Sequence, residues 1–333
     1  MSYSVLDTVV LTRDRRSPMN ARMRYGIGVV IVIAAIAAVG FQARQRGDIT
    51  GSAAPGEVVA NAPLFDNLGS YHRPVSTRSA DAQRYFDQGL RLTYAFNHGE
   101  AIRAFETATR LDPECAMCWW GIAYAYGPNI NAPMDPASEV SAYAAAVRAQ
   151  SLAEGAAPVE RALIDALALR YADPPGNRAE LDAAYARAMA SVRSQFANDN
   201  DVLTLHAEAV MNLRPWDYWQ RDGSPREGTA AIVADLERVL ASDPDHPGAC
   251  HYFIHAVEAV EPERAVACAE RLAALMPGAG HIVHMPAHIY LRVGRYDDAT
   301  EVNERAIEAD EAYLASDPVA GNMTYEVGYV PHN

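Results

Sequence analysis

The sequence predicts an all-α protein in which helical hairpins stack into a solenoid, preceded by one apolar amino-terminal helix. Three observations predict this fold. From Ala82 onward, apolar residues recur at the spacing of amphipathic helices. Alanine, leucine, arginine and glutamate dominate this region, and runs of β-branched residues are rare. A pattern of small, large and proline residues also recurs with a period of about 34 residues, as it does in stacked hairpins.

The composition excludes several classes of chemistry. The 333 residues include 28 basic and 42 acidic side chains, for a net charge of -14, and every basic residue is arginine. The absence of lysine excludes a Schiff-base lysine, a phosphate-loop lysine and a lysine general base. The acidic balance argues against nucleic acid as a partner, because backbone binding needs clustered positive charge. Four cysteines are too few for a fold built on disulfides.

The amino terminus has the features of a membrane anchor. Residues 25–43 carry no charge, and their length as a helix is close to the thickness of a bilayer core. The basic flank is heavier on the amino-terminal side, which predicts that residues 1–24 form a cytoplasmic basic tail and that the rest lies outside. A cleaved signal peptide, which would leave a secreted protein, is the alternative. The arginines before the apolar segment are Arg13, Arg15, Arg16, Arg22 and Arg24.

A linker and an acidic body follow the apolar segment. Residues 44–64 are rich in glycine, alanine and proline, which is typical of a linker, and residues 65–333 are predicted to form the repeat domain. Residues 1–50 hold seven arginines and three acids, a net charge of +4, so the remainder has a net charge of -18. A basic anchor followed by an acidic body supports this division.

The first predicted hairpin carries the clearest repeat pattern. Small residues at positions 8 and 20 let two antiparallel helices touch, large residues at 4, 11 and 24 fill the space between hairpins, and proline at 32 ends the second helix. The segment therefore resembles the tetratricopeptide repeat superfamily, which implies a solenoid whose first helices line a concave groove. The residues at positions 4, 8, 11, 20, 24, 27 and 32 are Tyr85, Gly89, Leu92, Ala101, Phe105, Ala108 and Pro113.

The later repeats are less regular. A loop rich in proline and asparagine over residues 127–136 delays the second helix of the next hairpin to about Ala137–Ala153. Two further helical pairs are expected between residues 159 and 213. Pro244 and Pro277 lie 33 residues apart, and each is expected to close a helix. The chain stops at Asn333 without a predicted capping helix, so we expect a truncated repeat with an exposed apolar end.

Histidines give the most specific functional signal. Half of the ten histidines lie between residues 251 and 288, in two groups with helical spacing. Corresponding histidines lie 33 residues apart, so adjacent repeats would present imidazoles at the same heights of the groove. Such imidazoles can meet at one transition-metal ion, with zinc, copper or iron left open. The predicted ligands are His251, His255, His284 and His288, with His281 and Glu258 as supporting ligands or as a base for metal-bound water.

Alternatives to a metal site are left open. The groove would also suit a non-catalytic scaffold whose histidines bind a peptide segment, or the histidines would only cap carbonyls and pack. Pro286 cannot continue an uninterrupted helix, and if a helix begins near Met285 then His281 and His284 would come from the preceding loop. His332 would be an extra ligand if the terminus folds back. Whether the protein is an enzyme is left open.

The four cysteines form two candidate pairs. Cys115 and Cys118 have the spacing of a local disulfide or of a metal-binding pair, and a disulfide is the expectation outside the cytoplasm. Cys250 and Cys268 are expected on the two helices of one hairpin, either as buried thiols or as a second disulfide.

Three segments resemble a group of bacterial exported or membrane-anchored tetratricopeptide proteins without a settled activity. The resemblance is carried by residues 85–131, 246–258 and 280–299. It implies a single-pass protein of the bacterial inner membrane with its repeat domain in the periplasm, or a secreted protein after signal cleavage. It implies no reaction. Members of the group continue past a motif like residues 329–333, which agrees with a truncated chain.

Overall fold

The structure is a computed structural model that describes residues 61–316 and 324–333. The predicted basic tail at 1–24, the anchor at 25–43 and all but the end of the linker at 44–64 lie outside the described residues. Within the described part of the chain, no helix combines the length and the apolar character needed to cross a membrane.

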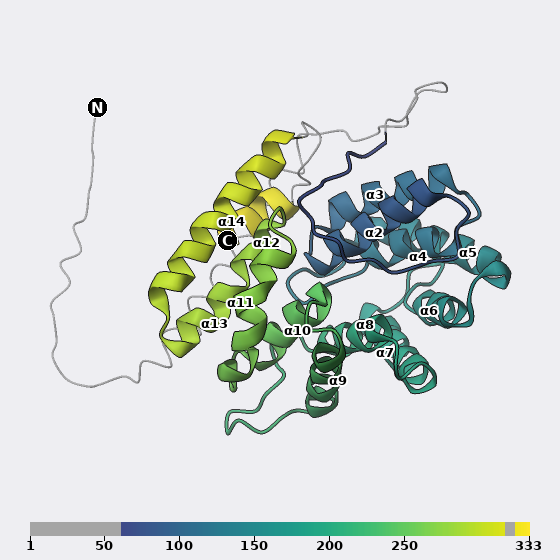
Figure 1. Cartoon of the computed structure of the whole chain (residues 1–333). Coiled ribbons are helices and arrows are strands. Elements are labelled where there is room, and N and C mark those ends of the chain that lie inside the picture. The colour runs from purple at the N-terminus through teal and green to yellow at the C-terminus, as the bar shows by residue number, and fades with distance from the viewer. Residues whose placement is uncertain (1–60, 317–323) are drawn as a thin grey trace, which may run out of the picture. The chain divides into compact units, whose positions relative to one another are not determined.

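The all-α prediction is confirmed for the described residues, which form helices and no strand (Figure 1). Short 3₁₀ turns occupy Pro136–Ser138, Ala153–Gly155 and Pro262–Ala265, and a π turn occupies Tyr325–Tyr329. The α-helices are α2 Ala80–Tyr94, α3 His98–Leu111, α4 Ala116–Tyr126, α5 Glu139–Leu152, α6 Pro158–Ala168, α7 Arg178–Gln195, α8 Asn200–Met211, α9 Thr229–Ser242, α10 Pro247–Val257, α11 Val266–Leu275, α12 Gly280–His284, α13 Pro286–Val293, α14 Tyr296–Ser316 and α15 Val330–His332.

The first hairpin has the packing that its repeat pattern predicts. Helices α2 and α3 pack against each other, and α3 packs on α4. The Phe105 ring of α3 is fully buried between two glycines, Gly89 of α2 and Gly121 of α4. A Cβ atom at Gly89 would lie 2.6 Å from the ring, and one at Gly121 would lie 2.4 Å from it. The small residues are therefore required by the close approach of three helices.

The middle of the array follows the prediction with one correction. Helix α5 begins at Glu139, close to the expected Ala137. Three helices, α6, α7 and α8, lie in the stretch where two pairs were expected, and the fourth, α9, begins only at Thr229. The intervening segment carries Pro215 and the left-handed residue Trp216, which a continuous helix does not accommodate.

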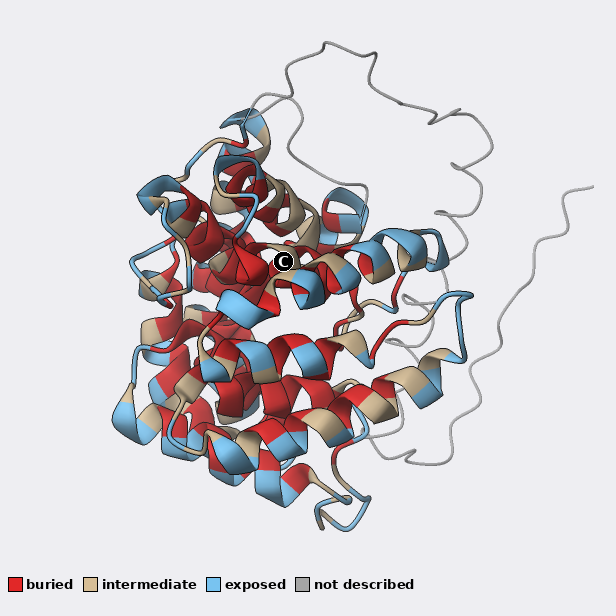
Figure 2. Cartoon of the chain, turned by 90° about the vertical axis from the view of Figure 1, so that its right-hand side faces the viewer, coloured by how far each residue is buried: buried red, intermediate tan, exposed pale blue. Residues whose placement is uncertain are grey.

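Helices from the first and last parts of the described chain both pack against α10. Helix α10 packs on its neighbours α9 and α11 and also on α2, α8 and α13, and all of its residues are buried (Figure 1). Figure 2 shows buried residues on the inward sides of the helices and exposed residues on their outer sides. The segment before α2 crosses to α8, where the Tyr71 hydroxyl donates to Asp201 over 2.7 Å and the Arg73 guanidinium donates to Asp199 and Asp201. The histidine-bearing face of α10 therefore lies inside the protein, which corrects the expectation of an open groove.

The carboxyl-terminal helices bring further histidines to the same interior. Helices α12 and α13 meet at Met285, and Pro286 occupies the first position of α13. His281 and His284 lie on α12 and are not in a loop. The described residues after α14 turn inward, where Tyr325 and Tyr329 are buried, and the Tyr325 hydroxyl donates to Asp310 over 2.8 Å. Two tyrosines of residues 324–333 are thus inside the fold, where an exposed apolar end was expected, and Val327 is exposed.

Candidate metal centre

Six imidazoles and one carboxylate converge at this interior. The structure brings together every predicted ligand, His251, His255, His281, His284, His288 and Glu258, and adds His332. The rings form a continuous cluster, with 4.9 Å between the centroids of His251 and His255, and the same distance between those of His284 and His288. The two pairs meet through His255 and His288, whose centroids are 5.3 Å apart. The cluster comprises residues of α10, α12, α13 and α15 and Glu258, which follows α10.

Four central rings, those of His251, His255, His284 and His288, each have a hydrogen-bond acceptor beside Nδ1. His251 Nδ1 lies 2.6 Å from the Tyr94 carbonyl oxygen, and His284 Nδ1 lies 2.8 Å from Asn303 Oδ1. His255 and His288 share one carboxylate, with distances of 3.1 Å to Glu258 Oε1 and 2.9 Å to Glu258 Oε2. These oxygens accept hydrogen bonds, so each Nδ1 carries the hydrogen, and in the neutral ring Nε2 presents a lone pair.

The Nε2 atoms of the four central rings face one another two by two. His251 Nε2 and His255 Nε2 are 3.1 Å apart, and His284 Nε2 and His288 Nε2 are also 3.1 Å apart. Two unprotonated nitrogens at this distance repel each other unless a proton or a metal ion lies between them. Two bonds of about 2.0–2.1 Å to a tetrahedral ion would separate the nitrogens by about 3.4 Å. The observed spacing is thus close to that of two ligands of one ion.

A third histidine completes each pair. His281 offers a ring nitrogen within 4.8 Å of those of His251 and His255, and His332 does the same for His284 and His288. His281 is fully buried, and its Nε2 atom has no hydrogen-bond partner within the described parts of the chain. A buried nitrogen without a partner is costly, and a metal bond would satisfy it.

Burial also favours the neutral, metal-binding form of several rings in the cluster. Burial, followed by the neighbouring imidazoles, lowers the pKa of His284 to about 2 and that of His332 to about 4. Burial lowers the pKa of His251 as well. Burial alone would raise the pKa of the Glu258 carboxyl, but His288 and His255 outweigh it and hold that pKa below its ordinary value. His251, His284 and His332 are therefore neutral rings close to the Glu258 carboxylate.

Two aromatic residues in left-handed backbone conformation cover the cluster. Among the described residues other than glycine, only Phe96 and Trp216 have positive φ, at 58° and 65°. The Phe96 ring lies 4.4 Å from that of His251 and 5.5 Å from that of His281, and the Trp216 ring lies 4.9 Å from that of His255. Such conformations cost roughly 1–2 kcal/mol each and are concentrated at functional sites.

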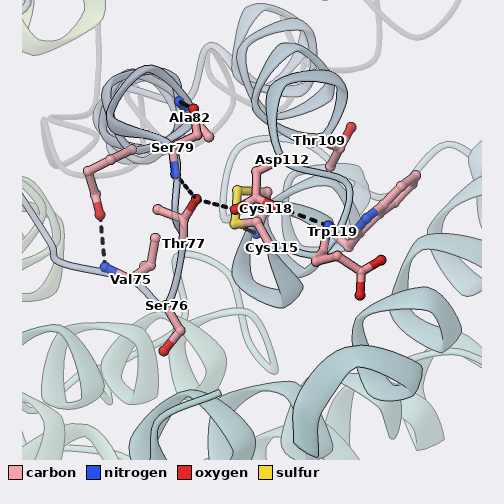
Figure 3. The surroundings of a disulfide bond; sticks show 12 residues. Val75, Ser76, Thr77, Ser79, Ala82, Thr109, Asp112, Cys115, Cys118 and Trp119 are labelled. Atoms are coloured by element: carbon pink, nitrogen blue, oxygen red, sulfur yellow. Dashed lines mark hydrogen bonds between the residues drawn. A yellow bond between two sulfur atoms is a disulfide. The ribbon is translucent and has the colours of Figure 1, made fainter. Parts of the chain in front are cut away.

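The cysteines occupy separate places. Cys115 and Cys118 form a disulfide at the start of α4, beside Asp112 and Thr77 (Figure 3). Helix α4 contributes no residue to the histidine cluster. Cys250 of α10 and Cys268 of α11 are buried thiols whose sulfur atoms lie 2.8 Å apart.

Sequence reasoning identified the histidines but missed the residues that orient and cover them. The Tyr94 carbonyl and the Asn303 amide come from α2 and α14, and Phe96 comes from the turn after α2. No local sequence pattern marks these positions, since their role depends on contacts between distant helices. The signal for His332 was its residue type alone.

Comparisons with known proteins give a structural similarity and no family. No protein-family model matches the chain, and no curated protein matches it. Among solved structures, the chain is similar to that described as "YrrB: a TPR protein with an unusual peptide-binding site", with 12% sequence identity and a TM-score of 0.29. The match covers 70% of this chain and 89% of that chain. The chain's own helix pairing and the Gly89–Phe105–Gly121 contacts define an array of packed helical hairpins.

Proposed function

We propose that this protein binds a transition-metal ion through its buried histidine cluster. The observation that carries the proposal is the orientation of the imidazoles: the Nδ1 atoms lie against fixed oxygens, and the Nε2 atoms face each other in pairs at 3.1 Å. Metal-binding histidines in proteins are oriented in this way by an acceptor on the other ring nitrogen. An all-imidazole set suits zinc, copper or iron.

The cluster offers chemistry as well as binding. His332 is exposed and His288 is half-buried, so solvent reaches one side of the ligand set. A bound ion would supply Lewis acidity or an activated water at that side. Glu258 is held as a carboxylate by His255 and His288, so it orients these rings and is not free to act as a general base.

We also propose that the repeat domain lies outside the cytoplasm, anchored by residues 25–43 or secreted after their removal. The uncharged segment with its heavier basic amino-terminal flank supports this location. The Cys115–Cys118 disulfide agrees with it, because disulfides persist in oxidising compartments.

A peptide-binding scaffold is the competing function. The YrrB structure is described as having a peptide-binding site, whereas in this chain the histidine-bearing face of α10 is covered by other parts of the same chain. A cavity of about 310 Å³ remains between residues 64–68, the end of α2 and α14, lined by Phe65, Leu92 and Tyr313 among others. A peptide held there would leave the histidines without a role in binding.

Metal analysis of the purified protein tests the proposal. The protein is stripped with a chelator, incubated separately with zinc, copper and iron, freed of unbound metal, and measured by inductively coupled plasma mass spectrometry. We expect stoichiometric metal that is lost in the double variant His255→Ala/His288→Ala. The matched control His72→Ala removes an imidazole that is 53% exposed and lies outside the cluster, and it should retain the metal.

Circular dichroism of each variant checks that the helices remain intact. Absence of stoichiometric metal from the folded wild-type protein under all three loading conditions would contradict the proposal, as would equal retention by the double variant.

A further inference from the structure

We infer that the histidine cluster holds two metal ions in two separate three-histidine sites, with Glu258 as a shared hydrogen-bond acceptor between them. This inference rests on the proposed metal binding. The inner site comprises His251, His255 and His281, and the outer site comprises His284, His288 and His332.

The direction of the rings separates the two sites. His255 and His288 both direct Nδ1 toward Glu258, one to each carboxylate oxygen. The Nε2 atom lies on the opposite side of an imidazole ring from Nδ1, so the two Nε2 atoms face away from Glu258. Each then meets a different partner, His251 Nε2 in one case and His284 Nε2 in the other. One ion cannot bond to both pairs while Glu258 holds both rings.

The repeat geometry reproduces the same half-site twice. His251 and His255 are separated by four residues, as are His284 and His288, and the pairs lie 33 residues apart. Both pairs have the same Nε2–Nε2 distance of 3.1 Å. A third histidine from another element joins each pair, His281 from α12 in the inner site and His332 from α15 in the outer site. Two equivalent ligand sets indicate two ions.

A single ion at Glu258 is the competing arrangement. His255, Glu258 and His288 also offer ligand atoms within 4.8 Å of one another. That ion would bond to the two Nδ1 atoms, yet these lie 2.9 and 3.1 Å from carboxylate oxygens, which are ordinary hydrogen-bond distances. It would also leave both pairs of facing Nε2 atoms and the unpartnered His281 Nε2 unexplained.

The two sites differ in access to solvent. All three inner histidines are buried, under Phe96 and with Trp216 against His255. In the outer site only His284 is buried. An outer ion should therefore exchange first, and Trp216 should report on the inner ion through its fluorescence.

The experiment is a metal titration of the full chain. The stripped protein is titrated with zinc by calorimetry and analysed by mass spectrometry under native conditions. We expect two equivalents per chain in the wild type and one equivalent in each of His251→Ala and His284→Ala. One equivalent in the folded wild type would overturn the two-site inference while preserving metal binding, and zero equivalents would overturn metal binding itself.

The variant Glu258→Gln separates an orienting role from a ligand role. Because Glu258 acts through the rings that it orients, the variant should still bind two equivalents, with affinities about 10–100-fold lower at both sites. Loss of one equivalent with the other affinity unchanged would identify Glu258 as a ligand and overturn its assignment.

Copper quenching gives a second readout, in which the cluster histidines are left unchanged. Cu²⁺ should quench the fluorescence of Trp216 in step with the second, slower equivalent, and Trp216→Phe should remove that slow component. Quenching of Trp216 that is complete with the first, fast equivalent would overturn the inner and outer assignment.

Discussion

The substitution Asp201→Asn tests the network that closes the array around α10. Asp201 is buried on α8 and accepts from Tyr94 over 2.6 Å and from Arg73 over 2.7 Å. It also accepts from Tyr71, and His246 at the start of α10 lies 3.3 Å from the same oxygen. One carboxylate thus joins α8, α2, α10 and the segment before α2.

The expected cost follows from the partners that remain. Removing one member of a buried ion pair costs about 3–5 kcal/mol, because the other charge is left buried. Arg73 would retain Asp199, which it contacts over 2.9 and 3.1 Å, and asparagine would keep one acceptor oxygen. We therefore expect Asp201→Asn to lower the free energy of unfolding by about 3 kcal/mol, the lower end of that range.

The loss of stability caused by Asp201→Asn should become smaller as the pH falls. Burial alone would raise the pKa of Asp201, but Arg73 and His246 outweigh it and hold this pKa well below its ordinary value. A carboxyl with a lowered pKa in the folded state stabilises the protein above its unfolded pKa of about 3.9, and this contribution is lost as the pH falls. The difference between wild type and variant should narrow by about 1.4 kcal/mol per pH unit below about pH 4.

Urea denaturation followed by circular dichroism at several pH values measures both effects. The matched control is Asp81→Asn, which breaks an exposed pair with Arg84 whose side chains are 63% and 64% exposed. Exposed pairs contribute little, so the control should change the free energy of unfolding by less than about 0.5 kcal/mol. A cost below about 1 kcal/mol for Asp201→Asn at pH 7, or a cost that is constant down to pH 3, would refute the reasoning.

Three further predictions concern other parts of the fold. Burial raises the pKa of Glu208 to about 7 in the folded state, from 4.5 in an exposed glutamate. The free energy of unfolding of the wild type should therefore fall as the pH rises from about 4.5 to about 7, because the unfolded chain ionises first. Glu208→Gln lacks this loss, so its melting temperature relative to that of the wild type should rise between pH 5 and pH 7. Gly89→Ala should cost about 1–3 kcal/mol in urea denaturation by overpacking, whereas Gly155→Ala, with nothing within 4 Å of the new carbon, should cost under about 0.5 kcal/mol. Oxidised glutathione should join Cys250 to Cys268, whose sulfur atoms are 2.8 Å apart, and thiol alkylation after denaturation should then find no free thiol; two alkylated thiols would contradict this.

The hairpins could be predicted because their determinants are local. Gly89, Phe105 and Pro113 act within one repeat, and Pro244 and Pro277 each follow the end of a helix. Spacing along the sequence is enough to identify such features.

Closure of the array could not be predicted in the same way. It depends on contacts such as that of His251 with the Tyr94 carbonyl, which joins residues 157 positions apart. No repeat pattern encodes such a contact, so an open groove was expected where the fold has an interior.

The candidate site shows the same division between local and distant determinants. Helical spacing predicted that His251 and His255 share one face, and the structure places their Nε2 atoms 3.1 Å apart. Spacing cannot show which ring nitrogen carries the hydrogen, because the acceptors come from other elements. The number of ions depends on that choice, so the sequence suggested one common ion where the ring directions support two.

The cover of the site argues most strongly that the cluster is functional. Local rules favour glycine at positive φ, yet Phe96 and Trp216 adopt it, and both place their rings against imidazoles of the cluster. At Phe96 this conformation also ends α2, because the Phe96 N–H donates to the Thr93 carbonyl and the Asn97 N–H donates to the Leu92 carbonyl, as in a helix cap where glycine is usual. A helix cap does not require a large ring, whereas packing against His251 and His281 does, so the choice of phenylalanine over glycine at this position is explained by the cluster.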